Sequence, residues 1–379
     1  MTDLENILPL WHELEDAEED YVLATVVDVE GPSYRKPGAR MLIARDGRRA
    51  GTVSGGCLEA EVAKRAWWLT ESGAVVRRYS TAADDGEMPY GSGCGGVVYV
   101  LLERRLTAAP LLRALEDAFH ARLPLAIATV LDGAEIGNRS FAGPTIAEHR
   151  AQDKSSRDLE STLENMAVGS LERMQSTDQR VKIGDNTTRV WVDYRAARPG
   201  LWVFGAGDDA KPIVQLARQL GWFVAVADGR SHLATHDRFP AAVSVVVLPI
   251  SEMPWPSVAD MKATDAAILV THSFDQDARI MASLLKRESL PAYVGVLGPQ
   301  RRTREVLAEA ARLLGLDATL ERVEQWLGQL HAPTGLDIGA ETPAAIALSI
   351  IAEIQQTLSN GSALPLRQVR AVQPVPTKA

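Results

Sequence analysis

The chain has 379 residues, of which 46% are hydrophobic and 23% charged, a balance typical of soluble globular proteins with two or three domains. Its 49 acidic and 40 basic residues give a net charge of −9, which argues against nucleic acid as the main partner. We expect a cytoplasmic protein without membrane association, because no apolar run could span a bilayer and the acidic N-terminus does not resemble a signal peptide.

The first elements lead to a basic loop. Residues 4–19 place apolar side chains at helical spacing, and residues 21–29 form a continuous apolar run of strand length. A proline-bounded loop follows, and a strand over 41–44 leads to the hairpin signal Asp46-Gly47. Because the prolines restrict this loop, Arg35 and Lys36 are candidate anion ligands; the alternative is a solvated basic loop.

Ser54, Gly55 and Gly56 immediately precede a helix predicted over 58–69. Unpaired N–H groups at a helix start bind anions, so these three residues are candidate ligands for a phosphate. Cys57 lies at the same helix start, where the helix dipole stabilises a thiolate. This position favours a catalytic or metal-ligating role for Cys57.

The second cysteine, Cys94, lies in a glycine-rich loop between strands predicted over 75–79 and 97–102. This loop resembles the Cys57 segment, and a catalytic role is the hypothesis for Cys94 as well. For both cysteines the alternative is a small buried side chain without function. No further cysteine or nearby histidine pair completes a zinc site, and two cysteines do not make a disulfide scaffold.

A helix over 111–120 and a strand over 125–131 complete an N-terminal domain, residues 1–135. Residues 143–180 are polar with weak helical periodicity, and residues 191–194 have the composition of a short strand. We therefore expect residues 136–199 to be a partly helical connecting segment.

From residue 201 strands and helices alternate, which predicts a doubly wound parallel sheet over 200–358. The expected strands span 201–204, 223–227, 243–248, 266–270 and 293–297. Thr342-Pro343 begins a mostly apolar helix that we expect to be buried, followed by a loose tail over 359–379.

Gly205-x-Gly207-x-x-Ala210 fits the dinucleotide-binding fingerprint, and Asp228 ends the next strand, where a ribose-binding carboxylate belongs. Gly205, Gly207 and Asp228 are therefore candidate nucleotide ligands. Asp208 and Asp209 would repel a bound phosphate, which leaves NAD binding open.

His272 follows the strand over 266–270, at the edge of the sheet where such folds bind ligands. It is a candidate acid–base group or metal ligand, and the alternative is a residue that only caps the next helix. Asp275 and Asp277, in that helix, are candidate metal ligands or dipole partners.

The sequence resembles the XdhC/CoxI family, accessory factors of xanthine dehydrogenase and related molybdenum hydroxylases. The resemblance is carried, in the family order, by GPSYRKPGARMLI, GTVSGGCLEAEV, GSGCGG, VFGAGDDA, THSFDQDA, AYVGVLGPQRR and GLDIGAETPAAIALSIIAEI. The chain departs from the family pattern at Asp208, where relatives have histidine, and at Ser54, where they have the first of three glycines.

This resemblance implies an N-terminal α/β XdhC/CoxI domain and a C-terminal Rossmann-like domain. It also implies transient binding of the molybdenum cofactor (molybdopterin), support of its sulfuration, and its insertion into a xanthine dehydrogenase-type molybdenum hydroxylase. On this interpretation Cys57 is the sulfur-bearing or metal-facing residue and Cys94 its partner. A cysteine desulfurase is a second expected partner, a homodimer the expected assembly, and a nucleotide in the Rossmann domain an additional ligand.

The resemblance therefore implies a maturation chaperone rather than an independent redox enzyme. Two alternatives stay open. One is an NAD(P)-dependent oxidoreductase with His272 as its acid–base group, and the other is a nucleotide-sensing regulatory module.

Overall fold

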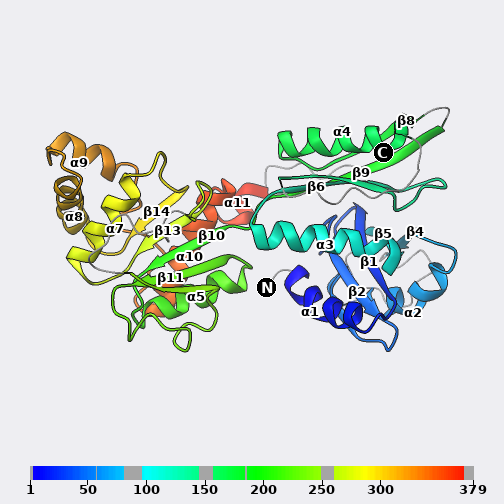
Figure 1. Cartoon of the computed structure of the whole chain (residues 1–379), viewed down its shortest axis with the longest axis horizontal. Coiled ribbons are helices and arrows are strands. Elements are labelled where there is room, and N and C mark those ends of the chain that lie inside the picture. Colours follow the sequence, from blue (N-terminus) through cyan, green and yellow to red (C-terminus); the bar gives the residue numbers. More distant parts are fainter. Residues whose placement is uncertain are drawn as a thin grey trace. The chain divides into compact units, whose positions relative to one another are not determined.

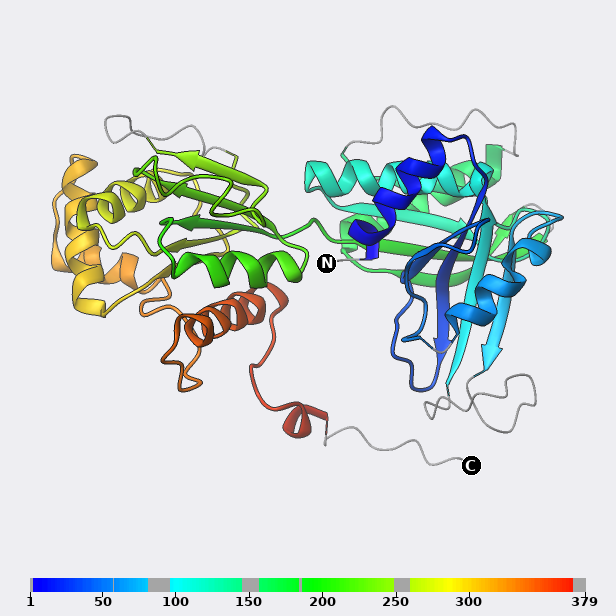
Figure 2. The same ribbon diagram turned by 90° about the horizontal axis from the view of Figure 1, so that it is seen from below.

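The computed structural model describes residues 3–56, 58–80, 96–144, 157–183, 186–248 and 260–370. They form two compact units, Met1–Arg198 and Pro199–Ala379. Figures 1 and 2 show a mixed α/β arrangement in each unit, as the sequence predicts. Cys57 and Cys94 lie outside the described residues.

Unit 1 opens with an antiparallel sheet, here called sheet A, with helices on both faces. Its elements are α1 (Asp3–Asp16), β1 (Tyr21–Glu30), β2 (Arg40–Ala44), β3 (Arg49–Gly51), α2 (Glu59–Leu69), β4 (Val75–Ser80), β5 (Val97–Arg104) and α3 (Arg105–Ala121). The strand order is β3-β2-β1-β5-β4, and the β2–β3 hairpin turns at Gly47 as predicted.

The continuous apolar run of β1 reflects burial on both faces of sheet A. Val22 and Ala24 pack in one hydrophobic cluster with α2, while Tyr21 and Leu23 pack in another with α1 and α3. Alternate strand side chains point to opposite faces, so a strand covered on both sides needs apolar residues at nearly every position.

A second antiparallel sheet, sheet B, follows in the same unit. Its elements are β6 (Leu125–Val130), β7 (Arg139–Ala142), α4 (Arg157–Arg173), β8 (Thr177–Ile183) and β9 (Asn186–Arg195). The strand order is β7-β6-β9-β8, and α4 packs against one face. The prediction that residues 136–199 are a connecting segment is therefore wrong, because these residues form three of the four strands of sheet B and helix α4.

Two buried ion pairs join the sheets of unit 1. Arg40 of β2 donates from Nη2 to Asp193 of β9 over 2.8 Å, and Arg139 of β7 pairs with Glu103 of β5. Burial lowers the pKa of the Arg40 guanidinium to about 10, and the nearby charge of Arg195 acts in the same direction. Removal of one partner would leave a buried charge unpaired, so each pair ties its two sheets together.

Unit 2 is the doubly wound domain predicted from the sequence. Its elements are β10 (Gly200–Phe204), α5 (Ala210–Gln219), β11 (Phe223–Asp228), β12 (Ser244–Val247), β13 (Ala266–Leu269), α7 (Phe274–Leu285), β14 (Tyr293–Val296), α8 (Gln300–Leu313), α9 (Leu320–Leu327), α10 (Pro343–Ser359) and α11 (Leu366–Arg370). The strands are all parallel, in the order β12-β11-β10-β13-β14.

Helices cover both faces of this sheet C. α5 and α10 share one apolar cluster with it, and α7, α8 and α9 share the other. Within the sheet, β11 lies next to β10 on one side, and β13, which comes later in the chain, lies next to β10 on the other side. The resulting switch point between β10 and β13 is where folds of this type bind ligands.

Two expectations for the C-terminal part need correction. α10 starts at Pro343 with Thr342 as its cap, as predicted, but its outer face is open and Leu348 is exposed. The expected loose tail contains the short helix α11, while residues 371–379 lie outside the described part. None of the helices within the described ranges is long and apolar enough to cross a bilayer.

Candidate functional site

The glycine turn before α2 binds an anion supplied by the chain itself. The Glu59 carboxylate accepts hydrogen bonds from the N–H groups of Val53 (3.1 Å), Ser54 (2.9 Å) and Gly56 (3.0 Å). The Ser54 hydroxyl also donates to it over 2.7 Å, and that hydroxyl oxygen accepts from the Leu58 N–H. The donors expected to hold a cofactor phosphate at Ser54 and Gly56 are therefore used internally.

Glu59 is held in its charged form at this turn. Burial would raise the pKa of its carboxyl, but the hydrogen bonds from Ser54 and the backbone outweigh burial, and the net pKa is lowered. A carboxylate that accepts several N–H donors is strongly stabilised as the anion. The turn thus has a fixed shape before any ligand arrives.

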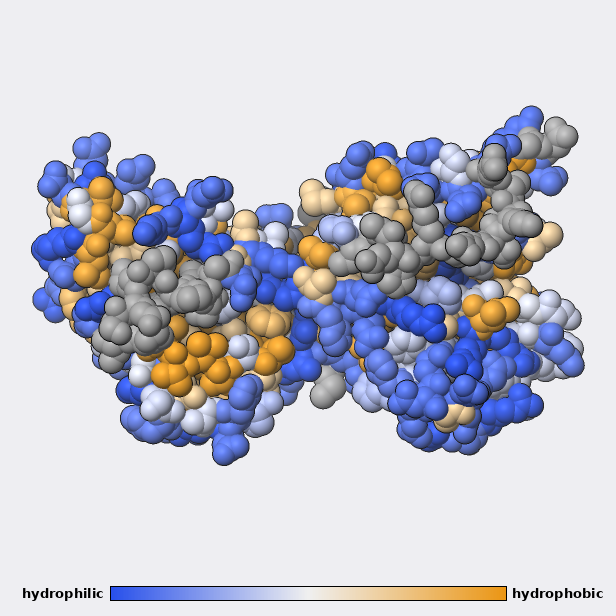
Figure 3. All heavy atoms as spheres, viewed as in Figure 1, coloured by the Kyte–Doolittle hydropathy of each residue, from blue (hydrophilic) through white to orange (hydrophobic). Residues whose placement is uncertain are grey.

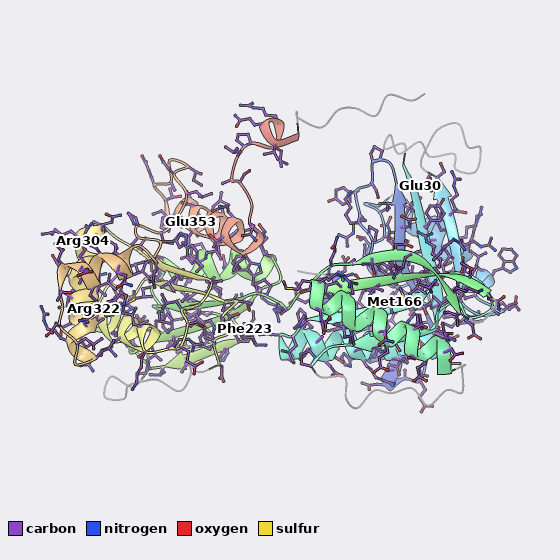
Figure 4. The ribbon with its side chains drawn as sticks, turned by 90° about the horizontal axis from the view of Figure 1, so that it is seen from above. Glu30, Met166, Phe223, Arg304, Arg322 and Glu353 are labelled. Atoms are coloured by element: carbon purple, nitrogen blue, oxygen red, sulfur yellow. The ribbon has the colours of Figure 1, made fainter. Side chains whose placement is uncertain are left out.

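The proline-bounded loop, residues 31–38, contacts both glycine motifs. A Cβ atom on Gly55 would stand 3.1 Å from the Tyr34 ring, and one on Gly96 would collide with the Pro32 carbonyl oxygen. The second contact follows from the pairing of β1 with β5, in which Glu30 lies opposite Val97. Figure 4 marks Glu30 at this end of β1.

These contacts bring Gly55 and Gly96 to one loop. Gly55 precedes Cys57 by two positions, and Gly96 follows Cys94 by two positions. Cys57 and Cys94 themselves lie outside the described residues. The catalytic roles of both cysteines, and metal ligation by Cys57, therefore stay predictions. Gly55 stays a candidate ligand.

The two basic residues of the loop differ in their surroundings. Arg35 is half-buried, and its guanidinium pairs with the Asp3 carboxylate of α1. The Ser33 hydroxyl donates to the backbone carbonyl oxygen of Arg35 over 2.7 Å. Lys36 is exposed. Arg35 therefore anchors the loop to α1, and its predicted role as an anion ligand would require it to leave Asp3.

In unit 2 the Rossmann turn brings β10 and β13 close together. A side chain at Gly205, whose φ is +124°, would collide with the Val270 carbonyl oxygen, so only glycine fits. Gly207 lies against Asp209. Both glycines lie at the turn between β10 and α5, as the fingerprint predicts, and nucleotide binding by them stays a prediction.

Asp228 is fully buried beneath this turn. Its carboxylate accepts from the Ala206 N–H over 2.7 Å and pairs with Arg230 over 2.7 Å. Burial raises the pKa of this carboxyl, but the bonds from Arg230 and Ala206 outweigh it and lower the pKa overall. A ribose hydroxyl would have to displace one of these partners, so the predicted ribose contact has no free acceptor here.

His272 lies at the carboxyl end of β13, beside the switch point, as predicted. Its Nε2 is 2.8 Å from the Asp209 carboxylate, and its φ of +58° is uncommon for a residue with a side chain. Helix α7 is capped by Ser273, whose hydroxyl accepts from the Gln276 N–H, so His272 is not the cap. The His272–Asp209 pair is partly open to solvent.

The neighbouring aspartates have structural partners. Asp277 is buried, accepts from the Thr271 hydroxyl over 2.6 Å and pairs with Arg302 over 2.6 Å, while Asp275 pairs with Arg279. Asp208 pairs with Lys211 and Arg238. Across the described ranges no group of three His, Cys, Asp or Glu residues is arranged to hold a metal ion.

A further polar network was not predicted. The Tyr293 hydroxyl donates to Glu353 over 2.6 Å, His331 Nδ1 lies 3.1 Å from the same carboxylate, and the Tyr293 and His331 rings stack at 4.1 Å. Figure 4 shows Glu353 on α10. The network fastens α10 to β14, and its residues are too far apart in sequence to suggest it.

Two family models match the sequence: the XdhC and CoxI family over residues 14–80, and the XdhC Rossmann domain over residues 201–354. A Bacillus subtilis (strain 168) protein, named as a probable subunit of xanthine dehydrogenase, is 30% identical over 351 residues, which cover 91% of this chain and 94% of that protein. The Escherichia coli (strain K12) molybdenum cofactor insertion chaperone PaoD is 25% identical over 342 residues, covering 88% and 82%.

Among solved structures, a crystal structure described as a xanthine dehydrogenase from Bacillus halodurans is similar over 99% of this chain and 98% of its own. The TM-score is 0.71 and the sequence identity 25%. The likeness therefore extends over both units of the chain.

Proposed function

The chain belongs to the XdhC and CoxI family, and from this we propose that it is a maturation factor for a xanthine dehydrogenase-type molybdenum hydroxylase. In this role it binds the molybdenum cofactor as cargo, supports its sulfuration and inserts it into the partner enzyme. The names of the relatives support the proposal, since one is named a molybdenum cofactor insertion chaperone and another a probable subunit of xanthine dehydrogenase.

The observation that carries the proposal is that Gly55 and Gly96, each two positions from a cysteine in the sequence, both contact loop 31–38. Pro32 contacts Gly96, and Tyr34 contacts Gly55. This arrangement supports a shared site for Cys57 and Cys94, in which soft thiolates face molybdenum or a sulfur atom in transit. Cys57 is the proposed metal-facing residue, and Cys94 its partner.

Tyr34 supplies the loop with an aromatic surface for the cargo. Its side chain is 79% exposed although it lies against Gly55. An exposed aromatic ring beside a candidate site offers a stacking face for a planar heterocycle. We therefore assign Tyr34 the role of stacking on the pterin ring.

The finer parts of the proposal come from the family resemblance. They are a cysteine desulfurase as the source of sulfur, a homodimer as the assembly, and a cytoplasmic location. Each stays a prediction.

A second candidate function is an NAD(P)-dependent oxidoreductase, favoured by the His272–Asp209 pair at the switch point of sheet C. Two features argue against it. Asp208 and Asp209 place carboxylates where a pyrophosphate would lie, and Asp228 has both oxygens engaged by Ala206 and Arg230. A nucleotide in unit 2 therefore stays an open prediction.

The proposed function is tested by activation of a cofactor-free xanthine dehydrogenase-type hydroxylase. The full chain is loaded with isolated molybdenum cofactor, mixed with the inactive enzyme, and the recovered activity is compared with that from free cofactor. We expect faster and more complete recovery with the chain, and loss of this gain in Cys57→Ala. Equal recovery with and without the chain would remove the insertion role.

A further inference from the structure

The internal use of the glycine turn leaves the anionic end of the cargo without an obvious binding site. Glu59 occupies the N–H groups of Val53, Ser54 and Gly56, the last two of which the sequence had offered to a phosphate. A phosphate bound in unit 1 therefore cannot use these three N–H groups without displacing Glu59. A cavity between α2 and β4 has other donors.

This cavity, called the α2–β4 pocket, has a volume of about 220 Å³. That is smaller than the pockets of whole drug-sized ligands, which start at about 300 Å³, and it suits one charged group with part of its carrier. The polar and aromatic lining residues are Glu61, Arg65, Trp68, Arg77, Arg78 and Tyr79. α2 packs on one face of sheet A, whose edge strand is β4 (Figure 1).

The sequence builds the α2 wall through helical spacing. Glu61, Arg65 and Trp68 are separated by four and three positions, which places them on one face of α2. The opposite wall comes from β4, an edge strand that pairs only with β5 among the described strands. The pocket therefore opens at the margin of the sheet and not within its core.

The charges in the pocket favour an anion. Two guanidinium groups, from Arg65 and Arg77, lie beside a single carboxylate, Glu61, which pairs with Arg65. Arg78 is the next residue on β4, so its side chain points to the other face of sheet A, where it bonds Tyr99. The formal balance of Arg65, Arg77 and Glu61 is two positive charges against one negative, a net charge of +1, which attracts the negative charge of a phosphate monoester. Guanidinium groups also match phosphate oxygens in geometry.

An unused hydroxyl completes the pocket. Tyr79 is only 6% exposed, and its hydroxyl has no hydrogen-bond partner among the residues that the structure describes. Burial raises the pKa of this hydroxyl, with the charges of Arg65 and Arg77 opposing, so it stays protonated and able to donate. A buried donor without an acceptor is unfavourable unless a ligand or water supplies one.

The rim of the pocket favours a small polar ligand over a protein. Trp68 is 71% exposed and offers a flat face at the rim. Figure 3 shows that the surface of unit 1 over α2 is predominantly hydrophilic, without a broad apolar patch. Stable protein interfaces have an apolar centre, which this surface lacks.

We propose that the α2–β4 pocket binds a phosphate monoester, held by Arg65 and Arg77, with the Tyr79 hydroxyl donating to a phosphate oxygen. The ligand is the terminal phosphate of the molybdenum cofactor, and this assignment rests on the proposed function. Free inorganic phosphate shares the chemistry, so the two sources are separated by experiment. The position suits the cargo, because α2 begins two residues after Cys57.

The first experiment titrates the full chain with inorganic phosphate, followed by calorimetry or ³¹P NMR. Arg77→Ala is expected to weaken binding about tenfold, since it removes one charge-assisted contact. Tyr79→Phe is expected to weaken binding about threefold to tenfold without lowering the unfolding midpoint. The matched control is Arg49→Ala, an exposed arginine on β3 at the opposite edge of sheet A, which should stay within about twofold of wild type.

The outcomes separate the pocket from the proposed function. Absence of phosphate binding, or equal binding by Arg77→Ala and Arg49→Ala, overturns the pocket. The same variants are then titrated with isolated molybdenum cofactor. Parallel losses support the terminal phosphate as the ligand, and unchanged cofactor affinity overturns that assignment. A wild type that binds phosphate in the expected pattern but never binds cofactor keeps the phosphate site and removes the proposed function.

Discussion

Gly96 lies directly against Pro32, so that a methyl group on Gly96 would collide with the Pro32 carbonyl oxygen. The two residues extend the paired strands β1 and β5, whose last pair is Glu30 opposite Val97. The contact places the end of the Cys94 motif on the loop that also carries Tyr34, and Tyr34 lies against Gly55.

Substitution of Gly96 by alanine should therefore destabilise unit 1. The added methyl meets backbone, which cannot swing aside, and overpacking of this kind costs about 1–3 kcal/mol. Gly55→Ala is the matched control, because its methyl would meet the exposed Tyr34 ring, which can move. Urea unfolding of both variants measures the difference, and equal stabilities would contradict the contact.

Glu59→Gln should also lower the free energy of unfolding, by about 2–4 kcal/mol. The substitution replaces the carboxylate, which accepts hydrogen bonds from three backbone N–H groups and the Ser54 hydroxyl, with a neutral amide. Glu13→Gln serves as the control, since Glu13 is an exposed carboxylate paired with Arg48, and its loss should cost less than about 1 kcal/mol. A Glu59 variant as stable as the control would mean that the turn does not depend on this carboxylate.

The stabilisation by Glu59 should depend on pH in one direction. Its pKa is lower in the folded chain than the ordinary value of 4.5, so its contribution is complete above that value and is lost as the pH falls through the folded pKa. The difference in stability between wild type and Glu59→Gln should be constant near neutral pH and shrink in acid. Chemical unfolding at a series of pH values measures it, and a difference that grows in acid would contradict the assignment.

Tyr34→Ala should weaken cofactor binding about tenfold, because stacking of a heterocycle on an aromatic side chain contributes about 1–3 kcal/mol. Tyr34→Phe keeps the ring and should bind as wild type does. Neither change should alter stability appreciably, since the side chain is exposed. Fluorescence titration with isolated cofactor distinguishes the variants, and equal affinities for Ala and Phe would exclude stacking.

His272→Ala and Asp209→Asn distinguish the two candidate functions. A maturation factor whose cofactor contacts all come from unit 1 should keep its cofactor affinity within about twofold in both variants, because the substituted pair belongs to unit 2. The oxidoreductase alternative expects loss of nicotinamide-dependent turnover in both. Cofactor titration and a turnover assay with NAD and NADP, run on the same preparations, measure the two effects.

The sequence predicted the features that depend on local pattern. Asp46-Gly47 turned the β2–β3 hairpin, Thr342-Pro343 started α10, and the alternation of elements after residue 200 produced sheet C with His272 at its carboxyl edge. Each of these signals can be read from a few neighbouring residues: a turn residue for the hairpin, a capping residue for the helix, and a continuous apolar run for each buried strand.

What the sequence missed depends on pairing between distant segments. β8 has mostly exposed polar residues, so its composition did not indicate a strand, and only its pairing with β9 creates this part of sheet B. Ser54 and Gly56, the predicted anion ligands, donate their N–H groups to Glu59, five and three positions away, and the sequence pattern did not indicate this internal acceptor. The α2–β4 pocket needs a helix and an edge strand to meet, which no periodicity reveals.

The most direct test of the account is stoichiometric binding of isolated molybdenum cofactor by the full chain, compared between wild type and Cys57→Ala, with NAD and NADP titrated alongside. The account predicts stoichiometric cofactor binding by wild type, loss of that binding in Cys57→Ala, and weak or absent binding of both nicotinamide nucleotides. Tight nicotinamide binding with no cofactor bound would contradict it and move the function to His272 and unit 2.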